Sequence, residues 1–392
     1  TMPGWAGSSW YWMRYMDAHN TEEFANEEAL KYWENVDLYI GGSEHATGHL
    51  LYSRFWNKFL KDRGYAPTEE PFKKLINQGM ILGMSAYAFV LSKNFSVEIE
   101  DENSLDEEKY NDKFRFLVNE ITREHYISEE LYDKIRNNNF NDNDVEVFNK
   151  FDSEFQELVK ELKIKASVFP VNNESVRRIH VPVEFVDSSN KLNFEEFKKW
   201  RNNENLLQNY SCPKNYIVSR EVEKMSKSKY NVVSPDDICE EYGADTLRLY
   251  EMFLGPLEQS KPWNTAGITG VSGFLKKLWR LYFDDNGSVI VNDEPTADMY
   301  KSLHKTIKKV TEDIENFSFN TSVSRFMICV NELQQLKCNN RAILEPLAIL
   351  VSPYAPHIAE ELWSALGHEG SIATVAFPKF EEKYLVESEK EY

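Results

Sequence analysis

The stretch EKMSKSKYNVV, residues 223–233, decides how this chain of 392 residues is interpreted. Lys224, Lys227 and Lys229 alternate with two serines, which predicts a cationic loop carrying small hydroxyl donors. Such a loop can fold over a polyphosphate and stabilise the charge that develops on a leaving pyrophosphate. A solvated Lys/Ser loop without a ligand is the alternative that composition alone leaves open.

A helix start follows the lysine loop directly. Ser234 is a typical N-cap, Pro235 suits the first helical position, and Asp236 and Asp237 place carboxylates in the positive first turn. The loop is therefore expected to belong to a compact region rather than to a tail.

A second segment, YIGGSEHATGH at residues 39–49, predicts a strand, a glycine turn and a helix in that order. The strand-like run covers residues 36–40 and ends at Gly41 and Gly42. The helix is indicated by apolar residues at three- and four-residue spacing, namely Leu50, Leu51, Phe55, Phe59 and Leu60. This order is typical of the crossover element of a parallel sheet, and the glycines let a ligand approach the backbone closely.

Polar side chains cluster in the same segment. Glu44 lies at the expected helix start, where a carboxylate can bind ribose hydroxyls, and His45 and His49 are four residues apart, hence on one helical face. A zinc pair and a pair of packed helix histidines are the alternatives. The order His-Glu-x-x-His is absent, because the glutamate lies outside the pair, and no third ligand is indicated. With the lysine loop in the same chain, residues of a nucleotide and amino-acid pocket are favoured, and no metal is expected.

The segment WAGSSWYWMRY, residues 5–15, is dense in aromatic residues. It can be ordinary core. Alternatively it forms the apolar wall of a small-ligand pocket, with a few polar groups as anchors.

The chain divides by character into four expected regions. Residues 1–83 have an α/β pattern, 84–215 form an insertion module of α+β character, 216–265 contain the lysine loop and a connecting segment, and 266–392 turn helical. Apolar stripes support a helical bundle in the last region. Their members are Leu303, Ile307, Val310 and Ile314, then Val323, Phe326, Met327, Val330 and Leu333, then Ile343, Leu347 and Leu350.

Composition narrows the class of protein. Hydrophobic residues make up 42% of the chain, which excludes a disordered or fibrous protein, and no apolar run approaches the roughly 18 residues of a membrane span. The four cysteines form no Cys-x-x-Cys pair and no secretory leader is apparent, so a cytoplasmic protein is expected. The net charge of −19 argues against nucleic acid at first sight, although a local basic face can survive in an acidic protein.

Several ordered blocks resemble the leucyl-tRNA synthetases of the bacterial type, a family of class I aminoacyl-tRNA synthetases. The Lys-Met-Ser-Lys-Ser loop at 224–228 is the signature loop of that class. The other blocks are residues 1–15, 36–55, 229–263 and 353–363. The resemblance implies the second half of a Rossmann-type catalytic domain, a leucine-specific-like insertion and a helical bundle of the anticodon-binding type.

The resemblance also assigns roles to individual residues. Lys224 and Lys227 match the catalytic lysines that hold ATP phosphates. Glu44 matches the acid that binds the adenosine ribose, and the rest of the implied ATP site is Gly41, Gly42, His49 and Met225. The implied leucine pocket comprises Trp5, Ser8, Tyr11, Tyr39 and His45. The bundle would contact tRNA phosphates through Lys276, Lys277, Arg280, Lys305, Lys308 and Lys309, with Lys301 and Arg325 nearby.

The family's His-x-Gly-His element is absent, since none of the eight histidines lies in such a pattern. The resemblance therefore implies part of a larger synthetase, without the N-terminal half and the editing domain and inactive alone. The parent enzyme would activate leucine with ATP and Mg²⁺, hold no protein-bound metal, and transfer leucine to tRNA(Leu). Its partners would be tRNA(Leu), ATP, leucine and the missing N-terminal half. A non-catalytic module that binds tRNA or a subunit is the alternative.

Overall fold

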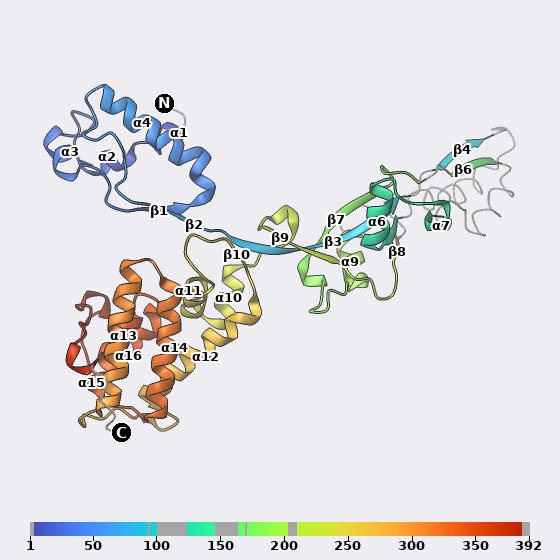
Figure 1. Cartoon of the computed structure of the whole chain (residues 1–392). Helices are drawn as coiled ribbons and strands as arrows, with labels where there is room; N and C mark the ends of the chain where they lie inside the picture. The colour runs from blue at the N-terminus through green and yellow to red at the C-terminus, as the bar shows by residue number, and fades with distance from the viewer. Residues whose placement is uncertain are drawn as a thin grey trace, which may run out of the picture. The chain divides into compact units, whose positions relative to one another are not determined.

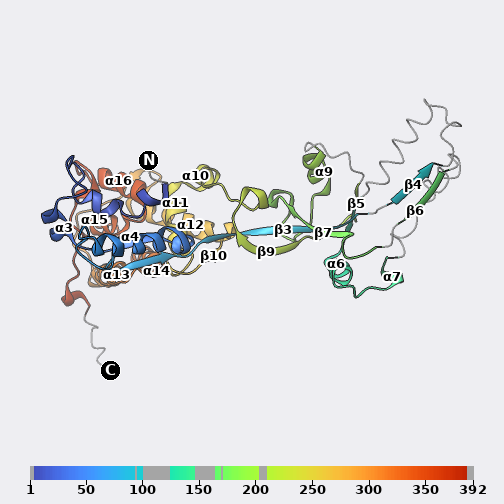
Figure 2. The same cartoon turned by 90° about the horizontal axis from the view of Figure 1, so that it is seen from above.

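The computed structural model describes residues 4–92, 95–99, 124–145, 164–168, 171–202 and 210–385. The chain divides into two compact units (Figures 1 and 2). The first unit comprises Thr1–Ile81 and Ser234–Tyr392, and the second comprises Leu82–Val233. The domain boundaries expected at residues 83, 215 and 265 stay predictions. Among the described residues, no helix combines the length and the apolar character needed to cross a membrane.

The N-terminal part of the first unit contains two parallel strands joined by a helix. Strand β1 (Tyr39–Gly42) pairs in parallel with β2 (Leu75–Gln78), and α4 (Leu51–Asp62) lies between them in sequence. The sequence predicts the strand over 36–40, yet β1 begins three residues later, at Tyr39, and ends two residues later, at Gly42. Glycine adopts extended backbone as readily as other residues, so Gly41 and Gly42 pair with β2 instead of ending the strand.

Three short helices precede these strands. They are α1 (Gly4–Gly7), α2 (Tyr11–Tyr15) and α3 (Glu27–Trp33). Trp12 and Met13 of α2, Leu30 of α3 and the loop residues Ala25 and Ala66 form one small core. Part of the aromatic segment is thus core, as one of its two interpretations predicts.

The helix expected after the glycine pair is confirmed. Most of its apolar stripe is exposed, whereas Leu60 packs against the small core that contains Trp12. Leu51, Phe55 and Phe59 are 61%, 65% and 47% exposed. The two fully buried residues of α4, Ser53 and Asn57, are polar. Asn57 donates from Nδ2 to the carbonyls of Thr68 at 2.9 Å and Glu69 at 3.0 Å.

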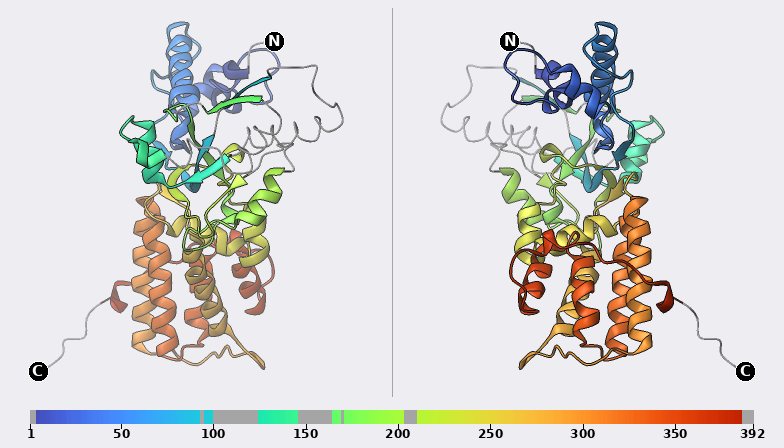
Figure 3. Two further views of the ribbon diagram at one scale, coloured as in Figure 1. Left: turned by 90° about the vertical axis from the view of Figure 1, so that its right-hand side faces the viewer. Right: turned by 90° about the vertical axis from the view of Figure 1, so that its left-hand side faces the viewer.

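The C-terminal part of the first unit is helical (Figure 3). Its elements are α10 (Pro235–Tyr242), α11 (Ala244–Phe253), β10 (Lys261–Pro262), α12 (Thr265–Tyr282), β11 (Phe283–Asp284), β12 (Gly287–Ser288), α13 (Ala297–Glu315), α14 (Phe319–Gln335), α15 (Arg341–Val351) and α16 (Pro356–Ala365). Helices α13 and α14 pack against each other, as do α12 and α14 and also α15 and α16. The predicted stripes are its core. Ile307, Val310, Phe326 and Leu347 are at most 1% exposed, whereas Ile314 and Met327 are half-buried.

Helix starts in this region follow the predicted capping chemistry. Ser234 accepts a hydrogen bond from the Asp237 amide, and Pro235 occupies the first turn of α10. The start of α16 is capped from another helix: the carboxylate of Asp245 on α11 accepts hydrogen bonds from the amides of His357 at 3.2 Å and Ile358 at 2.7 Å. Orphan amides at a helix start need such acceptors.

The second unit is built on the twelve-residue strand β3 (Ile81–Ser92). Strands β5 (Glu124–Ile127), β7 (Val176–Val181) and β9 (Ser219–Lys224) pair with it in antiparallel fashion, and β8 (Tyr210–Ser211) pairs in parallel with β5. A separate pair joins β4 (Phe95–Ile99) to β6 (Ile164–Val168). The helices are α6 (Glu129–Arg136), α7 (Asp142–Val145) and α9 (Phe194–Asn202).

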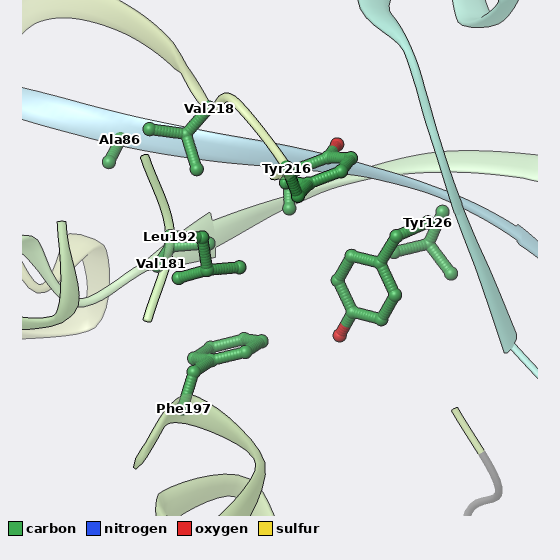
Figure 4. Close-up of a cluster of buried hydrophobic side chains, with 9 residues drawn as sticks. Ala86, Tyr126, Val181, Leu192, Phe197, Tyr216 and Val218 are labelled. Carbon is green, nitrogen blue, oxygen red and sulfur yellow. The ribbon is translucent and has the colours of Figure 1, made fainter. Parts of the chain in front are cut away.

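A core cluster lies against one side of this sheet (Figure 4). Tyr216 ties the cluster to two strands, because its hydroxyl donates to the Ile127 carbonyl and accepts from the Phe89 amide, both at 2.9 Å. Phe197 of α9 is 1% exposed in the same cluster. The segment that leads into β9 is thereby bound to β3 and β5.

Candidate functional site

The lysine loop leaves the end of β9 in the second unit. Lys224 is the last residue of that strand and pairs with Leu82 of β3. The residues Lys227–Lys229 form one 3₁₀ turn, and Tyr230 reverses the chain with a left-handed φ of 52°. Lys224 and Lys227 are exposed, and Met225 is half-buried. Each predicted phosphate-binding lysine can therefore reach a ligand in solution.

Lys229 is placed differently from the other two loop lysines. Its ammonium lies 2.7 Å from the Glu223 carboxylate, and its side chain is 32% exposed. Within the part of the chain that the structure describes, neither Lys224 nor Lys227 forms an ion pair. Glu223 directly precedes the first lysine, but no local pattern in the sequence indicates its role as the partner of Lys229.

In the first unit, three of the expected pocket residues meet through their polar ends. The hydroxyls of Tyr11 and Tyr39 are 2.8 Å apart, and the Tyr39 hydroxyl lies 2.6 Å from Nε2 of His49. Burial is the main cause that raises the pKa of Tyr39, and burial followed by the charge of His45 lowers the pKa of His49. A protonated phenol beside a neutral imidazole makes Tyr39 the donor and His49 the acceptor.

The turn after β1 brings Glu44 against the strand end. A Cβ on Gly42 would meet the Glu44 carboxylate at 2.2 to 2.5 Å, so the side chain folds back over the glycine. His45 Nε2 lies 3.9 Å from that carboxylate. The turn is not α-helical: Ser43–His45 is 3₁₀ and Ala46–Leu50 is π-helical, so the expected one-face relation of His45 and His49 does not follow from α-helical spacing.

The remaining residues of the implied leucine pocket are less closely placed. Ser8 is half-buried after α1, and Gly41 has open space where a Cβ would be. Trp5 lies in α1, but its side chain falls outside what the structure describes. Across the described ranges, no group of three or more His, Cys, Asp or Glu residues could hold a metal ion.

The basic residues expected to contact tRNA lie on two helices of the first unit. Lys276, Arg280 and Lys305 are exposed. Lys277 donates to Asn331 at 2.8 Å, Lys308 lies 3.6 Å from Glu382, and Lys309 pairs with Asp313, whose side chain is 3% exposed. These six residues are therefore not equivalent, because three of them already have partners.

The two basic residues near this set also differ in availability. Arg325 donates to the Thr306 hydroxyl at 2.9 Å and to the Ser302 carbonyl at 3.3 Å, so its guanidinium is occupied between α13 and α14. Lys301 is half-buried and lines a groove of about 300 Å³ together with Lys305. Lys305 is thus the residue of this helix whose charge is freest to meet a ligand.

Comparisons with protein families indicate the class of protein to which this chain is similar. The family "tRNA synthetases class I (I, L, M and V)" matches residues 212–261, which include the lysine loop. The family "Anticodon-binding domain of tRNA ligase" matches residues 297–392, which include α13 to α16. The chain is thus homologous to class I aminoacyl-tRNA synthetases, with a catalytic-type region and an anticodon-binding domain.

Within that class, its homologues are leucine–tRNA ligases. The chain is 62% identical to the leucine–tRNA ligase of Flavobacterium johnsoniae, 60% to that of Flavobacterium psychrophilum and 55% to that of Christiangramia forsetii, each over 100% of this chain. It spans about a third of the length of these curated relatives, 34% in each case. The family resemblance stated from the sequence is confirmed.

A solved structure supports the fold. The chain aligns with the LeuRS–tRNA–LeuAMS ternary complex of Agrobacterium radiobacter K84 at a TM-score of 0.55 and 22% identity, over 98% of this chain and 34% of that one. At this identity the likeness concerns the fold alone.

Proposed function

We propose that this chain is the part of a leucine–tRNA ligase that holds ATP phosphates during leucine activation and contacts the tRNA body. The observation that carries the proposal is the lysine loop, in which Lys224 and Lys227 are exposed and unpaired among the described residues while Lys229 is paired. Homology to leucine–tRNA ligases over the whole chain supports the substrate assignment. A cytoplasmic location belongs to the same proposal.

The proposed chemistry is positioning and charge stabilisation. The leucine carboxylate attacks the α-phosphorus of ATP, leucyl-adenylate forms and pyrophosphate leaves. A hydroxyl of the terminal ribose of tRNA(Leu) then attacks the leucyl carbonyl, and AMP leaves as the ester forms. Lys224 and Lys227 would stabilise the charge that grows on pyrophosphate, and the Met225 backbone lies between them. Mg²⁺ would accompany ATP as a counter-ion.

The segment after β1 would bind the rest of the adenylate. Glu44 is 40% exposed beside Gly42, so its carboxylate is available to ribose hydroxyls. The Tyr11–Tyr39–His49 chain offers a half-buried polar wall, with Ser8, His45, Gly41 and Trp5 proposed nearby. Hydrogen-bonding groups of this kind fix the orientation of a small ligand in an otherwise apolar site.

A second candidate is a module that binds tRNA or the remainder of the ligase without catalysis. The anticodon-binding match at residues 297–392 favours it, because that match does not include the lysine loop. Its phosphate contacts would come from Lys276, Lys277, Arg280, Lys305, Lys308 and Lys309.

Leucine-dependent exchange of pyrophosphate into ATP separates the two candidates. The chain is assayed alone and after mixing with the remaining part of the ligase, which is proposed to be its partner. We expect exchange only in the mixture, and we expect Lys227→Ala to lower it by about 100-fold, in the range of one lost transition-state donor. Lys214→Ala is the matched control, since Lys214 is an exposed lysine of the same unit.

Absence of exchange in the mixture, with tRNA still bound, would reject the catalytic proposal and retain the binding module. Exchange by the chain alone would contradict the expectation that it is inactive by itself. Equal rates in Lys227→Ala and Lys214→Ala would remove the lysine from the phosphate site.

A further inference from the structure

The lysine loop is fastened to strand β3 on both sides of its turn. We propose that Ser85, Tyr87, Glu223, Lys229 and Asn231 form an anchor that fastens both ends of loop 224–230 to strand β3, with Lys229 acting as a positioning residue rather than as a phosphate ligand. This inference deepens the function proposed above and rests on it for its meaning. We call the five residues the loop anchor.

Strand register explains why the anchor forms. In the antiparallel ladder Glu223 lies opposite Gly83, and side chains two residues apart on a strand share a face. Ser85 and Tyr87 therefore face the same side as Glu223. His180 of β7, which lies opposite Tyr87, joins them on that side.

Glu223 receives hydrogen bonds from several directions. The ammonium of Lys229 lies 2.7 Å from its carboxylate, His180 Nε2 lies 3.3 Å away, and the Tyr87 hydroxyl donates to it. The bond from Lys229, followed by those from Ser85 and Tyr87, holds the pKa of Glu223 well below its usual value. The carboxylate is thus charged and fixed near neutral pH, which makes it a firm partner for Lys229.

Asn231 closes the loop from its other end. Its side chain is 1% exposed, its Oδ1 accepts from the Ser226 amide at 2.9 Å, and its Nδ2 donates to the Ser85 hydroxyl at 2.8 Å. The same amide group lies 3.4 Å from the Lys224 carbonyl. One buried amide therefore joins the start and the turn of the loop to β3.

Gly83 makes this approach possible. A Cβ at that position would meet the Asn231 backbone oxygen at 2.5 Å, so a side chain there would displace the end of the loop. The absence of a side chain opposite Glu223 leaves the space that Asn231 occupies.

These contacts give the three loop lysines two different roles. Lys229 is held on Glu223, whereas Lys224 and Lys227 are exposed on either side of Met225 and Ser226. Rotating Lys229 towards a phosphate would leave Glu223 without its ammonium partner. The loop thus presents two cations to a ligand and uses the third to define their positions.

Hydrogen–deuterium exchange of the whole chain tests the anchor without any enzymatic activity. The readout is the exchange rate of the amides of Ser226, Lys229 and Tyr230, which are hydrogen-bonded within the loop. We expect Lys229→Gln to raise these rates about fivefold, because one charge-assisted contact is lost. Lys229→Arg should restore the slow rates, and Lys214→Gln should leave them unchanged.

The pair is tested by combining variants. Glu223→Gln alone should raise the exchange rates of the loop amides as much as Lys229→Gln does. The double variant should exchange no faster than either single variant. In the pyrophosphate-exchange mixture, the same non-additivity should appear in kcat with little change in the KM for ATP. Unchanged loop exchange in Lys229→Gln, or no rescue by Lys229→Arg, would overturn the anchor. If Lys229→Gln lowered kcat further when Glu223→Gln was already present, Lys229 would be identified as a phosphate ligand instead.

The outcomes are separable from those of the proposed function. A chain that never supports pyrophosphate exchange can still show an anchored loop by deuterium exchange. Conversely, a loop whose exchange is indifferent to Lys229 would leave the proposed roles of Lys224 and Lys227 intact.

Discussion

Asp245 of α11 holds the start of α16 through His357. Its carboxylate accepts hydrogen bonds from both the amide of His357, at 3.2 Å, and the ring Nδ1 of the same residue, at 2.8 Å. Asp245 is 8% exposed and so forms a tertiary helix cap between two segments that are 112 residues apart. The cap lies next to Pro356, which provides no amide of its own.

Replacing this carboxylate should destabilise the first unit. Asp245→Ala leaves the amides of His357 and Ile358 without an acceptor, and we expect the free energy of unfolding to fall by about 1–2 kcal/mol. Urea denaturation followed by circular dichroism measures the change. Asp285→Ala, at an exposed aspartate, is the control and should shift the midpoint little. Equal midpoints for the two variants would show that the cap contributes nothing.

Acidification should destabilise the bundle through His304. This imidazole is 6% exposed, and its Nδ1 accepts from the Glu381 amide at 3.0 Å. Burial is the main cause that lowers its pKa, so the unfolded chain binds the proton first as the pH falls through about 6.5. The stabilisation is complete above that value and is lost as the pH decreases towards the folded-state pKa.

His304→Asn tests this dependence, because the asparagine oxygen can accept the same amide without titrating. Urea midpoints at about pH 7.5 and about pH 5 should differ more for the natural chain than for the variant. An identical pH dependence for both chains would exclude His304 as the source.

The exposed stripe of α4 should contribute to self-association rather than to stability of this chain. Phe55 is 65% exposed, so Phe55→Gln is expected to change the free energy of unfolding by less than about 0.5 kcal/mol. Light scattering at high protein concentration should fall, because the most exposed phenylalanine of the stripe is removed. Phe326→Ala, at a residue with 0% exposure, should by contrast cost about 3–5 kcal/mol. A comparable loss in both variants would mean that α4 is covered in solution.

Charge reversal at Lys305 should weaken tRNA binding in a salt-dependent way. Lys305 is exposed on α13, so Lys305→Glu is expected to reduce the slope of log affinity against log salt by about one. Filter binding across a salt series measures this slope, with Lys379→Glu as the control at an exposed lysine outside the set. Identical slopes for both variants would remove Lys305 from the tRNA contacts. Lys309→Glu is unsuitable, because it would place a second carboxylate beside the buried Asp313.

Local patterns in the sequence predicted local structure well. The cap at Ser234, the apolar stripes of α13, α14 and α15, and the exposed Lys224 and Lys227 all depend on neighbours within a few residues. The burial of a helix face depends on what packs against it, and periodicity cannot supply that. For this reason α4 is confirmed as a helix while Leu51 and Phe55 are exposed.

The parts of the candidate site that the sequence did not predict are long-range pairings. Glu223 meets Tyr87 only because β9 and β3 share a register across 136 residues of chain. The resemblance places Tyr11 and Tyr39 in the leucine pocket and His49 in the ATP site, but their order as a hydrogen-bonded chain depends on side-chain directions that spacing leaves open. The proposed roles of these residues stay predictions until they are measured.

The π-helical turn at Ala46–Leu50 sets how the residues before it are rotated about the axis of α4. A π turn contains one residue more than the α-helical turn it replaces, and each residue advances an α-helix by about 100°. Without that additional residue, Glu44 and His45 would be rotated by roughly that angle about the axis of α4. Deleting a single residue there would leave the composition of the segment almost unchanged while turning Glu44 and His45 to another side of α4. The π-helical turn therefore sets the direction in which Glu44 and His45 point as well as the path of the backbone.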